Sequence, residues 1–182
     1  MKKWINIVIF TLICFIINSQ NLLDIPKLDS LNINWYYDKN MAPYSFENGI
    51  IITPPPYFLP FKYTNKQGFI NPKFLSSIEV EKINNVPYTI LAKKIKENLE
   101  EQNIFLINVE KNFTNSDKSC LIYEMIYNAM TSEGHNIDFH QIILVTGDYN
   151  TSIIGIAVFP EMYYKLMHNV MRESLLSIDC EN

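Results

Sequence analysis

Four side chains that can bind a metal ion lie close together in the sequence. They are Glu133, His135, Asp138 and His140. Carboxylates and imidazoles are the donors of zinc and calcium sites, and Asp138 and His140 would share a face if a strand began this early. However, the segment is expected to link two strands, where polar residues are common, and no HExxH motif or cysteine pair accompanies it. These residues remain candidates, and the sequence predicts no cofactor.

Motifs for catalysis do not accompany these residues. The chain has only five glycines, with no GxSxG elbow, no GxGxxG fingerprint and no Walker loop. Cys120 lies in a predicted buried strand, and Asp148 next to Gly147 is typical of a turn. We therefore expect no enzyme, and a hydrolase ranks last among the possible functions.

Two segments are the candidate contacts for a partner protein. They are Trp35, Tyr36 and Tyr37 in an aromatic-rich stretch, and Asp148, Tyr149 and Asn150 in a predicted turn. Aromatic rings give rigid contact area at interfaces. The alternative, which we favour for the aromatic stretch, is that its rings lie against the edge of the core.

The first twenty residues are typical of a bacterial secretory signal peptide. Lys2 and Lys3 precede an almost unbroken apolar run over residues 4–17, which small and polar residues end. A membrane anchor is the alternative, but the run is shorter than the roughly 20 residues that span a bilayer. We expect cleavage after Ser19 or Gln20, an irregular segment over 21–48, one domain over 49–182, and a periplasmic or secreted protein.

Charge and cysteine content narrow the functions further. The 15 basic residues become 13 when Lys2 and Lys3 are removed, against 19 acidic ones. An acidic chain without a basic run argues against nucleic acid and against an anionic membrane surface as partners. Cys120 and Cys180 then remain, and an oxidising compartment would allow a disulfide between them without requiring one.

Two segments have the three- and four-residue apolar spacing of an amphipathic helix. The first begins at Pro87, where a missing amide hydrogen does no harm, and the second follows Pro160. The polar residues of the second helix, among them His168 and Arg172, are expected to lie mainly outside its apolar stripe. The apolar stripes are Tyr88, Leu91, Ala92, Ile95 and Leu99 in the first helix, and Tyr163, Leu166, Met167, Val170, Met171 and Leu175 in the second.

The remaining apolar runs predict strands. Residues 54–61, which follow the first strand, are expected to form an extended loop because prolines lack amide donors. Several strands are apolar on both faces, which predicts a sheet covered on both sides, and short polar turns predict antiparallel pairing. We therefore expect an antiparallel sheet of six or seven strands with flanking helices. The predicted strands are 49–53, 68–70, 74–83, 104–109, 119–130, 142–145 and 153–159.

The order of these elements resembles the PsbP-like group. The resemblance rests on TPPPYF, on a helix opening with Val-Pro-Tyr, and on ILVTGD…IGIAVFP leading into a helix that ends in SLLS; it covers about residues 49–178. The group includes extrinsic photosystem II subunits and many bacterial proteins without an assigned role, and the eukaryotic Ran-binding import factor and bacterial secretion-effector chaperones share its fold. It implies an α/β/α sandwich and a binding or accessory role. The expected function is therefore an exported, non-enzymatic protein with a protein partner in the cell envelope; the alternative is a small-ligand or metal-binding periplasmic protein.

Overall fold

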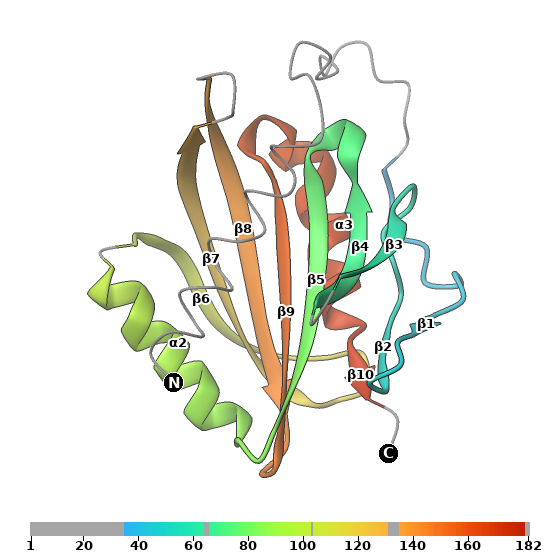
Figure 1. Ribbon diagram of the computed structural model, residues 1–182, viewed down its shortest axis with the longest axis vertical. Helices are drawn as coiled ribbons and strands as arrows, with labels where there is room; N and C mark the ends of the chain where they lie inside the picture. Colours follow the sequence, from blue (N-terminus) through green and yellow to red (C-terminus); the bar gives the residue numbers. More distant parts are fainter. Residues whose placement is uncertain (1–34, 64–65, 103, 131–134, 181–182) are drawn as a thin grey trace.

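The computed structural model describes residues 35–63, 66–102, 104–130 and 135–180. They form strands, two α-helices and two short 3-10 helices (Figure 1). In chain order these elements are β1 (Tyr44–Ser45), β2 (Ile50–Ile52), β3 (Leu59–Tyr63), β4 (Lys66–Asn71), η3 (Pro72–Phe74), β5 (Ser76–Asn84), α2 (Tyr88–Glu101), β6 (Leu106–Phe113), β7 (Ser119–Met130), β8 (Asn136–Gly147), β9 (Thr151–Pro160), η4 (Glu161–Tyr163), α3 (Tyr164–Leu176) and β10 (Asp179–Cys180).

The main sheet has seven antiparallel strands in the order β3-β4-β5-β9-β8-β7-β6. Strands β3 to β5 form one meander and β6 to β9 form another. The two meet where β5 pairs with β9 over the register Ser77↔Val158 to Asn84↔Thr151. The sheet is therefore continuous although its halves come from separate parts of the chain.

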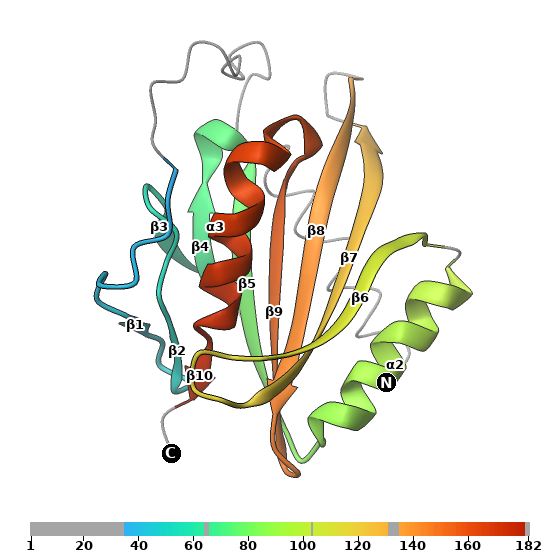
Figure 2. The same cartoon turned by 180° about the vertical axis from the view of Figure 1, so that it is seen from behind.

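Helices cover both faces of this sheet. Helix α2 lies on one face, and α3 lies on the other beside the small sheet β1-β2-β10 (Figures 1 and 2). Each face has its own apolar cluster, with Leu91, Ile95 and Leu99 of α2 in one and Met167 and Met171 of α3 in the other. The predicted α/β/α sandwich around an antiparallel sheet is confirmed.

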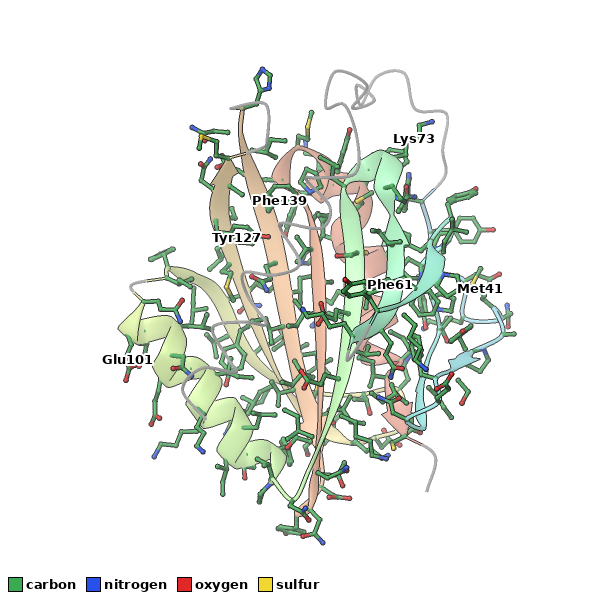
Figure 3. All side chains as sticks on the ribbon, viewed as in Figure 1. Met41, Phe61, Lys73, Glu101, Tyr127 and Phe139 are labelled. Atoms are coloured by element: carbon green, nitrogen blue, oxygen red, sulfur yellow. The ribbon has the colours of Figure 1, made fainter. Side chains whose placement is uncertain are left out.

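Local sequence explains where the helices begin and which side they bury. Pro87 caps α2 in an extended conformation, and Pro160 precedes the 3-10 turn that leads into α3. The predicted stripes pack inward, apart from half-buried residues at their borders. On the α2 side, Tyr127 and Phe139 occupy paired positions on β7 and β8, with stacked rings whose centroids are 5.8 Å apart (Figure 3).

The structure corrects several details of the prediction. Residues 59–61, expected in a loop, belong to the edge strand β3, because an edge strand tolerates the missing amide of Pro60. Strand β8 begins at Asn136, so His140 lies within a strand and not in a link. His168 faces the sheet, although the helix pattern assigned it to the polar side.

Two other expectations concern the termini and the cysteines. Cys120 and Cys180 are not joined by a disulfide. The predicted signal peptide, residues 1–20, lies outside the described residues. Within the described ranges, no helix combines the length and apolar character needed to cross a membrane.

Candidate functional site

A buried group of histidines and carboxylates lies between the sheet and α3. Glu124 comes from β7, His140 from β8, Glu161 from η4 and His168 from the second turn of α3. Ile126 is paired with His140 in the register, so Glu124 is the diagonal neighbour of His140 on the same face of the sheet. The α3 helix places His168 above both of them. Four elements therefore position one polar group.

The ligand atoms of this group lie close together. Both Glu124 contacts use the same oxygen, Oε2, which is 3.3 Å from His140 Nε2 and 3.0 Å from His168 Nε2. The two imidazole nitrogens and the carboxylate oxygen lie within 4.8 Å of one another. On the other side of its ring, His140 Nδ1 is 2.9 Å from Glu161 Oε2. His140 is thus held between two carboxylates.

Aromatic rings fix the two imidazoles. The His140 ring stacks on Phe159 with centroids 5.2 Å apart, and the Tyr164 ring lies tilted against it with centroids 5.0 Å apart. Tyr164 also stacks on His168 at 4.6 Å. Because Tyr164 is 38% exposed, the group is closed toward the sheet and open toward Tyr164 and His168.

Burial and hydrogen bonding set the electrostatics of the group. The side chains of Glu124 and His140 are only 6% and 2% exposed, and that of His168 is 17% exposed. Hydrogen bonds from His140 and His168 hold the pKa of Glu124 far below its usual value, against the effect of burial. The hydrogen bond to Glu124 raises the pKa of His168. Glu124 is therefore a carboxylate, the form that accepts hydrogen bonds or binds a cation.

A second polar contact extends the group along α3. Arg172, one turn after His168, pairs with Glu110 of β6. Burial alone would raise the pKa of Glu110, but hydrogen bonds from Asn112 and Arg172 lower it overall. At the β6–β7 turn, Asn115 N–H also donates to Leu176 O at 2.8 Å. These contacts hold β6 against α3.

The three metal-ligand candidates that the structure describes do not gather in one place. Of them, the structure brings only His140 into the group, and Glu133 lies outside the described residues. His135 is exposed, and exposed Asp138 accepts a hydrogen bond from Asn128 Nδ2 at 2.8 Å. Sequence reasoning missed Glu124 and His168. The available signal was a charged residue in the middle of an otherwise apolar strand.

The six predicted partner contacts divide into core and surface residues. Trp35 is half-buried and meets the rings of Phe58 and Phe74 edge-on, as expected of aromatics at the core edge. Tyr37 is also half-buried, while Tyr36 is exposed. Asp148 accepts the backbone N–H groups of Asn150 and Thr151, both at 2.7 Å, which lowers the pKa of Asp148 and fixes the β8–β9 turn. Tyr149 at this turn is 90% exposed, and Asn150 is exposed as well.

The outer edge of β6 is a second candidate surface. Strand β6 ends the seven-stranded sheet, and none of the described strands pairs with its outer edge. Alternate side chains face away from α3, and four apolar residues along this stretch are exposed. They are Phe105 at 81%, Ile107 at 48%, Val109 at 45% and Phe113 at 61%. Open backbone groups and apolar side chains therefore coincide on one edge.

Solved structures resemble this fold, whereas the sequence matches no known protein family profile and no curated protein. Cyanobacterial PsbP (CyanoP) from Synechocystis sp. PCC 6803 aligns over 86% of this chain and 98% of its own, with a TM-score of 0.54 and 12% identity. The chain has the PsbP-like fold. The Ran-binding protein Mog1p from Saccharomyces cerevisiae shares it, with a TM-score of 0.50 and 11% identity over 78% of this chain and 95% of Mog1p.

A Bacteroides thetaiotaomicron VPI-5482 protein has the same fold within a longer chain. It aligns over 78% of this chain with a TM-score of 0.54 and 11% identity, and the alignment spans 49% of the Bacteroides protein. The resemblance predicted from the sequence is thus confirmed at the level of the fold. At these identities it carries over no site residues.

Proposed function

We propose that the chain is an exported, non-enzymatic binding protein that acts on a protein partner in the cell envelope. The observation that carries this proposal is the outer edge of β6, where open backbone groups coincide with exposed Ile107, Val109 and Phe113. Extended segments of partner proteins bind such edges by adding a strand, with backbone hydrogen bonds for affinity and side-chain contacts for specificity. The proposed partner therefore presents an extended, apolar segment.

The two edges of the sheet support this choice. Both edge strands carry an exposed lysine, Lys62 in β3 and Lys111 in β6, but β3 also contains Pro60, which blocks pairing with another chain. Strand β6 has no proline and is longer. Its inner face is held by the Arg172–Glu110 pair, so little order would be lost when a partner binds.

The other parts of the proposal rest on composition and on fold. Lys2, Lys3 and the apolar run over 4–17 support export. Burial raises the pKa of the Cys120 thiol to about 11, so this cysteine is a poor nucleophile at neutral pH. A structural neighbour, Mog1p, is a Ran-binding protein, which supports protein binding as a use of this fold.

The β6 proposal is tested by affinity copurification from native envelope with matched variants. Val109→Lys places a charge on the proposed docking edge, and Leu59→Lys places the same charge at an exposed position of β3. A partner is expected with the wild type and with Leu59→Lys, and at least about tenfold less of it with Val109→Lys. Thermal melts check that both variants fold. Equal recovery with the two variants, or no protein specific to the bait, would overturn the proposal.

Export is tested separately by mass spectrometry of the protein recovered from the envelope fraction. The expected N-terminal peptide begins at Gln20 or Asn21. Recovery of peptides that contain Lys2 and Lys3 from most of the protein would contradict cleavage. This outcome is independent of the copurification result.

A further inference from the structure

We propose that Glu124, His140 and His168 bind a single zinc ion, a function beyond the proposed binding of a protein partner. The three ligand atoms are Glu124 Oε2, His140 Nε2 and His168 Nε2, and they lie within 4.8 Å of one another. Tetrahedral zinc with ligands at about 2.0–2.2 Å requires ligand atoms about 3.3–3.5 Å apart. Two of the separations are 3.0 and 3.3 Å. Small side-chain shifts therefore make room for the ion.

The surroundings of His140 match those of a metal ligand. With zinc on Nε2, the Nδ1–H of His140 donates to Glu161 Oε2, 2.9 Å away. A carboxylate behind a ligating histidine fixes its tautomer and orientation, and it makes the other nitrogen a better donor. Stacking on Phe159 further fixes the orientation of the His140 ring. Glu161 is therefore a positioning residue and not a ligand.

The donor set selects the class of metal. Two imidazoles and one carboxylate suit zinc and late first-row transition metals, whereas calcium and magnesium prefer sites made of oxygen atoms. The charge of Glu124 offsets part of the ion's charge in a buried site. A fourth ligand, water or a group from a ligand, would enter beside Tyr164 and His168, where the group is open to solvent.

The geometry also argues against a simple ion pair as the whole explanation. One oxygen atom of Glu124 faces the Nε2 atoms of two histidines that come from different elements. Glu110 Oε1 on the same side of the molecule also faces two donors, Asn112 Nδ2 and Arg172, but these are N–H groups that have no lone pair for a metal ion, unlike an imidazole nitrogen. The convergence of three donor atoms on one point is the feature that a bound cation explains.

The test uses purified, tag-free protein treated with a chelator and then dialysed against zinc. Elemental analysis is expected to give one zinc per chain, and zinc is expected to raise the melting temperature, whereas calcium is not. Cobalt(II) provides a spectroscopic check, because tetrahedral coordination by nitrogen and oxygen gives visible absorption. His168→Ala, at the most exposed ligand, is expected to weaken zinc binding at least about a hundredfold.

Two further variants keep the proposal falsifiable. His135→Ala removes an exposed histidine outside the group and is expected to bind zinc as the wild type does. Glu161→Gln is expected to lower zinc affinity by about ten- to a hundredfold while the cobalt spectrum keeps its shape. The proposal would be overturned if the wild type bound less than about 0.2 zinc ions per chain, on the order of non-specific binding. It would also be overturned if His168→Ala and His135→Ala bound zinc with equal affinity.

Discussion

Two carboxylates on opposite faces of the sheet are about equally buried, yet their pKa values are shifted in opposite directions. Glu79 on the α2 side is 4% exposed and Glu124 on the α3 side is 6% exposed. Burial raises the pKa of Glu79 despite its pairing with Lys66, whereas hydrogen bonds from His140 and His168 lower the pKa of Glu124. Burial alone therefore does not decide the state of a buried carboxyl. The balance between burial and the hydrogen bonds and charges that face the carboxyl does.

The comparison separates a structural ion pair from a candidate binding site. Lys66 Nζ lies 2.8 and 3.1 Å from the two oxygens of Glu79, so one flexible cation serves one carboxylate. At Glu124, two rigid rings from β8 and α3 point at one oxygen. Rigid donors from separate elements are what a metal site requires.

The largest expected effect comes from removing the cation beside Glu79. Lys66→Met leaves a buried carboxylate without its partner and is expected to cost about 2–3 kcal/mol at neutral pH, less than a fully buried pair because Lys66 is a quarter exposed. Lys62→Met, which removes an exposed partner of Glu47, is expected to cost under about 0.5 kcal/mol. Urea unfolding measures both. Equal costs would show that Glu79 does not need its partner.

A smaller effect is expected when each carboxylate is replaced by its amide in the presence of a chelator. Glu124→Gln loses two charge-assisted hydrogen bonds and is expected to cost about 1–2 kcal/mol. Glu79→Gln removes a buried charge and keeps an acceptor for Lys66, so the expected change is within about 0.5 kcal/mol. Thermal or urea unfolding of the pair gives the comparison directly. A larger cost at Glu79 would reverse the assignment of the two sites.

The smallest effect is a pH dependence that belongs to Glu79. Its pKa is higher in the folded protein than the ordinary value of 4.5, so the folded state holds the proton more tightly. The contribution of Glu79 to stability is then greatest below pH 4.5 and is lost as the pH rises through the folded pKa. Lys66 and Glu81 face the same group, and burial also raises the pKa of Glu81. Unfolding curves between pH 4 and 7 are expected to show that Glu79→Gln gains stability relative to wild type as the pH rises, and a difference that stays constant with pH would contradict the assignment.

Most of the fold follows from local patterns in the sequence. The β7 strand, both helices and the β8–β9 turn have periodicity, prolines or turn residues that specify them without tertiary information. The exceptions are positions where tertiary pairing outweighs local preference. Pro60 is tolerated because β3 is an edge strand, and β8 extends back to Asn136 because its neighbour β7 continues to Met130.

The candidate site could not be predicted from the sequence for a different reason. Glu124, His140 and His168 are 16 and 28 residues apart along the chain, and their meeting depends on strand register and on how α3 is rotated against the sheet. A helix pattern alone places His168 on the polar side. Glu124 in an apolar strand was the one local clue, since a buried charge needs a partner. The partner's identity comes only from the packing of three elements.

The pairing of β5 with β9 has a consequence for how the chain folds. In the described part of the chain it is the single ladder that joins the two meanders, and it links residues 77–84 to residues 151–158. During synthesis, the first meander must wait with an open edge until β9 has been made. Contacts so distant in sequence form slowly. We expect closure of this ladder to limit the folding rate, and a nascent chain that stops before Thr151 to expose the β5 edge to other molecules.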